Sequence, residues 1–468
     1  MRSKIILLIL LVLGFWVRLY KIDNPIADWH SWRQADTAAV TRNYVQQGID
    51  LFHPRYDDFS DVSGKGLFNP DGYRFVEFPI YNLIHFSFFK LFGYFTLEIW
   101  GRLTTIFASL ISTILLFAIV KKHSNNFIAL LSSFFLLFIP FNVFYSRVIL
   151  PDPLMVTFFL SAIYFVDTNF ILTLLFSILA VLVKPVAIFF LLPVFWQYKI
   201  SKKSLIIGIL CFGLFVIWRL WSLQFPQGVP ASGWLLNGNH IRFRPAFFGW
   251  MFHQRIGELI LGIWGVPLFV IGFLQSITKK YLYFLTWGIA SVVYLFTFAT
   301  GNVQHDYYQI SIIPSVSIFL AIGFYELWKF KENFFYTWAS RGLAIFCVGI
   351  MLYFGWYDVR GNGIKGYYQV NHWEIVHAGQ AVDRLTPKDA RVAAPYMGDT
   401  AFLYQTNRKG FPVMAMPIKD LHDRFNITYY VSTNFDDTTN EIIDKYTVVV
   451  KTPEYVIVKL VEKPKLLK

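Results

Sequence analysis

The chain has 468 residues, of which 56% are hydrophobic and only 15% are charged, and its net charge is +13. Soluble domains carry about a quarter of charged residues, so this composition excludes an ordinary soluble protein. Nucleic-acid binding is not indicated either, because the Lys and Arg residues cluster between apolar blocks, where they set membrane orientation and meet anionic lipid headgroups.

The apolar blocks predict a polytopic α-helical membrane protein, since each crossing needs roughly 20 apolar residues. The first block follows a basic start and resembles a signal peptide, but no cleavage site follows it, so we interpret it as an uncleaved helix. The cysteines, Cys211 and Cys347, lie inside apolar blocks and indicate no disulfide. About 11 transmembrane helices are predicted, at residues 5–20, 101–120, 127–144, 153–167, 170–183, 185–198, 205–222, 256–277, 282–299, 309–328 and 342–357.

The positive-inside rule predicts a cytoplasmic N-terminus. Four of the five short loops then inside are basic, while the facing turns carry little positive charge. Arg242, Arg244 and Arg255, in an outer loop, oppose the pattern. The compact chain favours a bacterial plasma membrane.

Two large segments then fall outside, residues 21–100 and 358–468. The first is predicted to be a structured loop with an interfacial helix at 80–95. The second alternates helix-like pieces (372–385, 399–406, 438–445) with β-rich runs (391–394, 427–431, 447–450, 455–460), which predicts a small C-terminal α/β extracytoplasmic domain. The predicted domains are therefore a transmembrane domain at 1–357 and an α/β domain at 358–468.

A dense polar run follows the first span, from Asp28 to Thr37. One interpretation is helix capping, in which Ser31 and Gln34 form a capping box and Arg33 pairs with Asp36. The other is catalysis, because a carboxylate near a low-dielectric boundary suits a general base. Asp36 is the first candidate.

Two further acids, Glu77 and Asp152, fit helix-start or turn positions. The topology nevertheless brings both to the same membrane face as Asp36, which favours a shared catalytic role. Lys184 interrupts a long apolar run at that face and suits a lipid-linked phosphate, although a snorkelling lysine is the simpler alternative.

Other candidates for binding a donor phosphate or sugar are His305 and Tyr308, in another outer turn, and His30 and Arg33 in the first loop. An interfacial aromatic belt is the alternative for the outer turn. No cofactor is indicated. A divalent metal stays an alternative without support, because His30, Glu77 and His305 match no ligand spacing. The sequence has no nucleotide-binding glycine loop, zinc-protease motif or nucleophile elbow.

Taken in order, these pieces resemble the membrane glycosyltransferases of the GT-C fold, in the dolichyl-phosphate-mannose protein mannosyltransferase-like group that includes the aminoarabinose transferases of lipid A. The likeness covers nearly the whole chain. It rests on residues 30–37, Glu77 to Tyr81, Phe89 to Gly93, Gly101 to Leu103, Pro151-Asp152, Lys184-Pro185, residues 305–308, Gly398 to Thr400 and Asn407 to Gly410.

The resemblance implies a polyprenyl- or dolichyl-phosphate-linked donor, transfer of a hexose or pentose with inversion, and a first-loop acid as base. The family commonly has an Asp-Glu pair in that loop, where this chain has Gln34-Ala35-Asp36. Asp36 is therefore the favoured base and Asp28 an alternative. The acceptor, whether glycan, lipid or protein, is not defined by the sequence.

Two other classes of function remain open. A lipid or sugar transporter (flippase) would also have many spans, but such proteins place polar residues near mid-membrane on repeated halves. Here the polar residues gather at one face and no repeat is visible. A scaffold or receptor would use only the outer tail.

Overall fold

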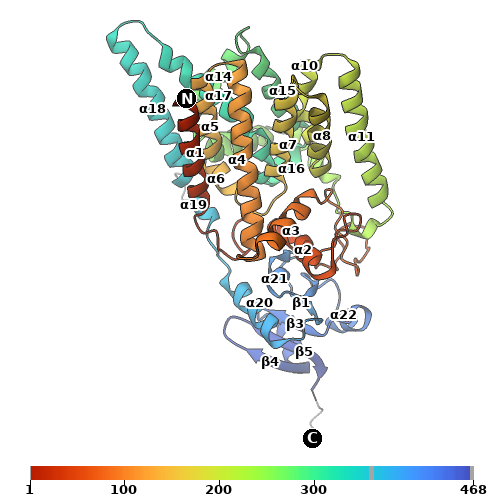
Figure 1. Cartoon of the computed structure of the whole chain (residues 1–468). Coiled ribbons are helices and arrows are strands. Elements are labelled where there is room, and N and C mark those ends of the chain that lie inside the picture. Colours follow the sequence, from red (N-terminus) through yellow and green to blue (C-terminus); the bar gives the residue numbers. More distant parts are fainter. Residues whose placement is uncertain (1, 358–362, 464–468) are drawn as a thin grey trace. The chain divides into compact units, whose positions relative to one another are not determined.

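The computed structural model describes residues 2–357 and 363–463. Over these residues the chain is mostly helical, with one small sheet near the C-terminus (Figure 1). It divides into two compact units. The helical unit comprises Met1–Ile22, Arg102–Arg219 and Ser232–Tyr368, and the mixed unit comprises Asp23–Gly101, Leu220–Ala231 and Gln369–Lys468. The large first loop and the C-terminal tail thus belong to one unit.

The helical unit contains several closely packed pairs of helices, notably α7 with α8, α14 with α17, and α5 with α17. Its elements are α1 (Arg2–Arg18), α4 (Leu97–His123, whose first turn belongs to the mixed unit), α5 (Asn126–Phe138), α6 (Pro140–Tyr145), α7 (Asp152–Phe165), α8 (Phe170–Val183), α9 (Ala187–Phe190), α10 (Leu192–Tyr198), α11 (Lys202–Ser222, whose last residues belong to the mixed unit), α12 (Trp234–Asn237), η2 (Gly238–Phe243), α13 (Pro245–Phe248), η3 (Gly249–Ile260), α14 (Val266–Ser276), α15 (Leu282–Thr297), α16 (Ala299–Gln304), η4 (Asp306–Ile312), α17 (Ile313–Lys329), α18 (Phe334–Tyr357) and α19 (Ile364–Tyr367).

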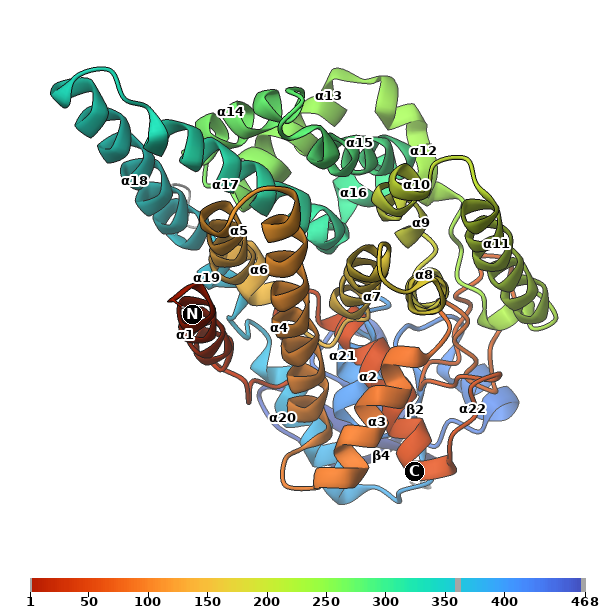
Figure 2. The same ribbon diagram turned by 45° about the horizontal axis from the view of Figure 1, so that its top comes forward.

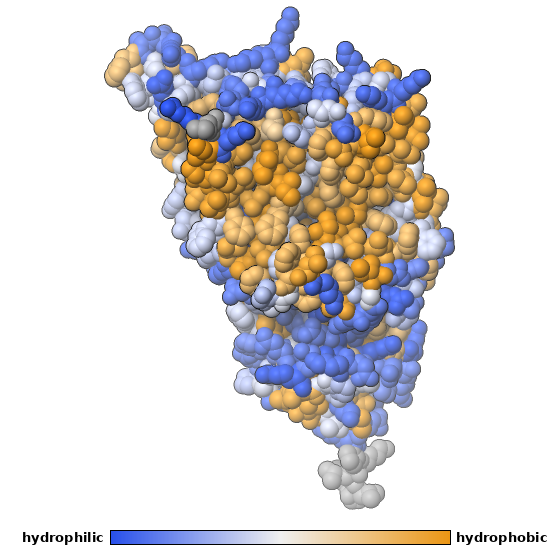
Figure 3. Space-filling view, in the orientation of Figure 1, coloured by the Kyte–Doolittle hydropathy of each residue, from blue (hydrophilic) through white to orange (hydrophobic). Residues whose placement is uncertain are grey.

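Within the described ranges, four helices are long and apolar enough to cross a membrane: Leu97–His123, Lys202–Ser222, Asp306–Lys329 and Phe334–Tyr357. Five shorter apolar helices accompany them. Hydrophobic side chains cover much of the helical surface in Figure 3. The chain is an integral membrane protein, as its composition predicts.

Several predicted spans are interrupted. The stretch 127–144 divides into α5 and α6 before Pro140, and 185–198 divides into α9 and α10 before Pro193. Proline lacks the N–H that continues a helix, so each break falls where the hydrogen-bond ladder cannot proceed.

The basic loops of the helical unit share one of its ends. Lys122 pairs with Asp167, beyond the end of α7, and Gln197 of α10 donates to the same carboxylate at 2.6 Å. The His123 ring stacks on Tyr283, at the start of α15, with 3.7 Å between ring centroids. The charge asymmetry seen in the sequence is therefore an arrangement in space.

The mixed unit is built on a five-stranded sheet of order β2-β1-β3-β5-β4, in which β1 runs parallel to β2 and β3, and β5 antiparallel to β3 and β4. The α/β prediction for the tail is confirmed, but β2 and α22 were not predicted. The elements are α2 (Ser31–Gln47), α3 (Ile80–Phe92), η1 (Pro226–Gly228), α20 (Trp373–Leu385), β1 (Arg391–Ala393), α21 (Thr400–Gln405), β2 (Lys409–Phe411), α22 (Ile418–Phe425), β3 (Tyr429–Ser432), α23 (Asp437–Lys445), β4 (Tyr446–Lys451) and β5 (Val456–Glu462).

The first loop is joined to this sheet at β2. Asp58 forms a parallel bridge with Gly410, and the Phe59 N–H donates to the Gly410 carbonyl at 2.8 Å. Phe59 is 2% exposed and packs in the core of the tail with Phe411 and Leu421. A Cβ on Gly410 of β2 would lie 1.8 Å from the carbonyl oxygen of Val392 on the neighbouring strand β1, so only glycine fits at this position.

Helices α2 and α3 lie side by side in both views (Figures 1 and 2). The Asn82 amide on α3 donates to the Thr37 carbonyl at 2.7 Å and to the Thr41 hydroxyl at 2.9 Å on α2. These bonds fix the helix that carries the first-loop candidates.

Candidate active site

Helix α2 does not begin with the predicted capping box. Its N-cap is His30, in the left-handed conformation (φ 54°), without a side-chain capping bond. The Gln34 amide instead donates to Asp28 at 2.7 Å, and Asp28 is 4% exposed. Capping therefore does not account for the polar run, and Gln34 serves to hold Asp28.

Asp36 is buried, with 4% of its surface exposed, and lies on α2. Its Oδ2 accepts a hydrogen bond from Arg74 at 2.5 Å, and its Oδ1 accepts one from the Thr400 hydroxyl at 2.7 Å. The predicted Arg33–Asp36 pair does not form, because Arg33 pairs with Glu77 instead. Two partners distant in sequence thus fix the Asp36 carboxylate.

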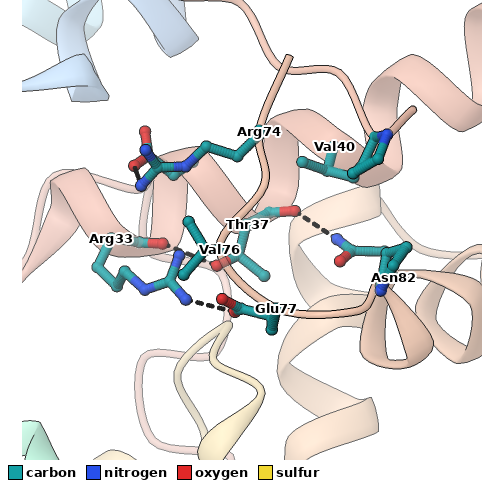
Figure 4. Close-up of a pocket in the computed structure, with 10 residues that line it drawn as sticks. Arg33, Thr37, Val40, Arg74, Val76, Glu77 and Asn82 are labelled. Carbon is teal, nitrogen blue, oxygen red and sulfur yellow. Dashed lines mark hydrogen bonds and ion pairs between the residues drawn. The ribbon is translucent and has the colours of Figure 1, made fainter. Parts of the chain in front are cut away.

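Glu77 uses one oxygen for Arg33, and its other oxygen, Oε2, is buried without a hydrogen-bond partner. Figure 4 shows Glu77 and Arg33 lining one pocket with Arg74. Asp36 lines it too. The pocket is small, about 20 Å³, which is room for a water-sized group such as a hydroxyl.

Two more acids influence this charge cluster. Burial raises the pKa of Asp399 to about 6, with the negative charge of Asp36 adding to the shift, and the Ala401 N–H opposes it. Burial likewise raises the pKa of Asp58 to about 6, again with a contribution from Asp36. Because each shift contains a charge–charge contribution, the three carboxylates share one electrostatic environment.

A second cluster lies in the helical unit. Lys184, at the end of α8, donates a hydrogen bond of 2.8 Å to Oδ1 of Asp152, which lies in the first turn of α7. Asp152 is 2% exposed, and its Oδ2 has no hydrogen-bond partner. The Lys184 ammonium lies 5.4 Å from the ring centroids of both Tyr307 and Tyr308, which favours a cation–π contact. Asp152 is the first residue of α7, so the helix-start interpretation fits its position, although no side-chain capping bond is made there.

His305 stacks on Tyr307 and Tyr308, with centroids 5.6 Å and 6.1 Å away, and so borders the Lys184 cluster. The structure therefore brings Asp152, Lys184, His305 and Tyr308 together in the helical unit. His30, Arg33, Asp36 and Glu77 lie in the mixed unit.

Sequence reasoning missed a polar centre beside His305. Asp306 is 1% exposed and accepts hydrogen bonds from the Tyr145 hydroxyl at 2.5 Å and the Tyr367 hydroxyl at 2.6 Å. Arg255, which opposes the positive-inside pattern, lies 3.7 Å from the same carboxylate. Tyr145 and Tyr367 lie at the ends of the short helices α6 and α19, and nothing in their sequence context indicated that both bind Asp306.

In residues 2–357 and 363–463 no group of three or more His, Cys, Asp or Glu side chains is arranged to hold a metal ion. The divalent metal kept as an alternative thus has no candidate cluster in that part of the chain.

No protein-family model matches the chain, and no curated protein matches it by sequence. Among solved structures, it is similar to ArnT from Cupriavidus metallidurans, bound to undecaprenyl phosphate (13% identity, TM-score 0.62) and in the apo state (12%, 0.63), with 99% of each chain covered in both cases. It is also similar to the apo oligosaccharyltransferase of Archaeoglobus fulgidus, at 9% identity and TM-score 0.57, over 91% of this chain and 69% of that one.

The chain has the GT-C fold. The resemblance predicted from the sequence is therefore confirmed as a likeness of fold. At such low identity the GT-C fold alone is established, and the roles of individual residues rest on the geometry of this chain.

Proposed function

We propose that the chain is a glycosyltransferase that moves a hexose or pentose from a polyprenyl- or dolichyl-phosphate-linked donor to a glycan, lipid or protein acceptor, on the outer face of the membrane and with inversion. The observation that carries the proposal is the buried Asp36 carboxylate, oriented by Arg74 and Thr400 at a pocket of hydroxyl size. The GT-C fold supports it.

Asp36 is the proposed base. Each of its oxygens has a further lone pair, so the carboxylate can accept the proton of an acceptor hydroxyl or amine. The acceptor atom bonds to the anomeric carbon while the bond from that carbon to the phosphate oxygen breaks, and the phosphate leaves with the electron pair. Glu77, with an unused buried oxygen, and Asp28 are the alternative bases.

Lys184 is the proposed phosphate-binding cation. Helices α7 and α8 have 14 residues each, so they are about 21 Å long, shorter than a hydrocarbon core of about 30 Å. The basic loops gather at the opposite ends of these helices. In the proposed topology, the Asp152–Lys184 pair therefore lies below the outer boundary of the hydrocarbon. Placing charged side chains inside the hydrocarbon costs free energy, so an ion pair at such depth favours a functional role. His305, Tyr308, Arg33 and His30 are proposed to contact donor phosphate or sugar.

The same proposal includes the membrane topology: about eleven crossings, a cytoplasmic N-terminus and an extracytoplasmic tail domain at 358–468, in a bacterial plasma membrane. The basic end of the helical unit supports this orientation, because positive loops stay inside.

The test is transfer from radiolabelled polyprenyl-phosphate sugars in membranes that contain wild-type protein, Asp36→Asn or Lys184→Ala. We expect wild type to consume one donor and both variants to be inactive while folded. If no donor is consumed and labelled lipid still crosses the bilayer, the protein is a transporter and the proposal fails.

A further inference from the structure

The mixed unit has a second, larger cavity of about 670 Å³, a volume typical of small-molecule sites. Its walls come from two parts of the chain that are far apart in sequence. The first loop contributes the end of α2 and residues 55–59 and 70–71, and the tail contributes 388–391 and 407–409. The Asp58–Gly410 bridge joins these walls, so backbone pairing within the mixed unit holds the two sides of the cavity together.

The lining is strongly basic. Six cations face three acids, Asp57, Asp71 and Asp389. The cations are Arg42, Arg55, Lys388, Arg391, Arg408 and Lys409.

Three of these cations are held by the protein itself. Arg42 pairs with Asp57 and donates to the Tyr404 carbonyl. Arg408 pairs with Asp383 at 2.8 Å, and Lys388 reaches the same carboxylate at 2.7 Å. Their charges are therefore compensated.

Arg55 and Lys409 differ. Across the described ranges, neither side chain has a hydrogen bond or an ion pair, and Arg55 has only the Tyr73 ring, 5.4 Å from its guanidinium carbon. Burial lowers the pKa of Lys409; the negative charge of Asp57 opposes this shift, and the charges of Arg55, Arg42 and Arg391 lower the pKa further. The cavity lining thus carries more positive than negative charge, and two of its cations have neither a hydrogen-bond nor an ion-pair partner among the described residues.

This cavity adjoins the Asp36 pocket. Pro54 lines the pocket and Arg55 the cavity, and consecutive Cα atoms are about 3.8 Å apart. On α2, Asp36 lines the pocket and Gln46 lines the cavity. At 1.5 Å per residue, these two positions are about 15 Å apart along the helix axis. A saccharide of two or three units spans such a distance.

We propose that this cavity binds a phosphate or carboxylate group of an anionic saccharide acceptor, with Arg55 and Lys409 as its ligands. The identity of the ligand as the acceptor rests on the proposed function, whereas anion binding does not. Guanidinium and ammonium groups are the usual partners of phosphate and carboxylate.

Anion binding is tested on the full chain in phosphatidylcholine nanodiscs, by calorimetric titration with inorganic pyrophosphate. We expect saturable binding that weakens at least tenfold in Arg55→Gln/Lys409→Gln and at higher salt. Lys459→Gln, an exposed lysine on β5 outside the cavity, is the matched control and should bind as wild type does. Absence of saturable binding, or equal binding by the double variant, overturns the proposal.

The source of the anion is tested by repeating the titration in phosphatidylglycerol nanodiscs. Unchanged binding supports a soluble or acceptor-borne group, whereas competition by the lipid would assign the cavity to a headgroup and overturn the acceptor role. In transfer assays we expect the double variant to raise the acceptor KM at least tenfold with kcat retained. If pyrophosphate binds but no donor is consumed, the proposed function fails and the anion site stands.

Discussion

Lys184 Nζ and Asp152 Oδ1 lie 2.8 Å apart although 32 positions separate the residues in sequence. The bond joins the end of α8 to the start of α7, two helices packed along their lengths. The contribution of this bond to stability and its proposed role in transfer can be separated experimentally.

Lys184→Met should destabilise the helical unit by about 3 kcal/mol, because it leaves the Asp152 carboxylate buried without its cation. Asp152→Asn/Lys184→Met removes both charges and should recover most of that loss without recovering transfer. Thermal unfolding in detergent and the transfer assay measure the two effects. Lys280→Met, at an exposed lysine, is the control, and a double variant as unstable as the single one would contradict the pairing.

The base is identified by comparing Asp36→Asn with Glu77→Gln. Loss of a general base should lower kcat by about 10²- to 10⁴-fold, so we expect that loss in Asp36→Asn. Glu77→Gln should retain most of kcat, and Asp61→Asn, at an acid held by local loop hydrogen bonds, should have the kcat of wild type. The pH profile of kcat/KM should lose its acidic limb only in the base variant. The reverse ranking would assign the base to Glu77.

The raised pKa of Asp399 makes stability depend on pH. This carboxyl group has a pKa of about 6 in the folded protein, against an ordinary value of 3.8, so it binds protons better when the chain is folded. The free energy of unfolding should therefore fall as pH rises from about 4 to 6, and level off above that. Asp399→Asn keeps the N-cap acceptor of α21 and should raise stability at pH 7.5 by about 2 kcal/mol.

Thermal unfolding from pH 4 to 8 measures this effect. Asp61 serves as the opposite control, because hydrogen bonds from Ser63 and the Gly66 N–H overcome burial and lower its pKa. Asp61→Asn should weaken the protein above pH 4. A pH dependence unchanged in Asp399→Asn would mean that other groups cause it.

Gly410→Ala tests the junction between the first loop and the sheet. The added methyl would overlap the Val392 carbonyl oxygen, and overpacking of this kind costs about 3 kcal/mol. We expect a lower unfolding midpoint and faster proteolysis of both the loop and the tail. Gly366→Ala has open space around its Cβ and should be neutral. Faster cleavage of the tail alone would show that the loop is held elsewhere.

Hydrophobic periodicity and charge predicted the helical membrane class and the α/β tail, because both are local signals. The same-face argument also selected Asp152 and Lys184, which are in contact. Arg74 and Thr400 could not be predicted as partners of Asp36, since they lie 38 and 364 residues from it. Likewise β2 has only three residues, with a glycine in the middle, too short for an alternation pattern.

The position of Phe59 in the core of the tail has a consequence for biosynthesis. Its neighbour Phe411 is made much later, and at about 5–20 residues per second the delay is roughly 20 to 70 s. During that time the first loop exposes an aromatic side chain whose core has not yet been synthesised. Nascent chains stalled before β2 should therefore be prone to aggregation and proteolysis. The first loop can complete its fold only after the strands of the tail have been synthesised.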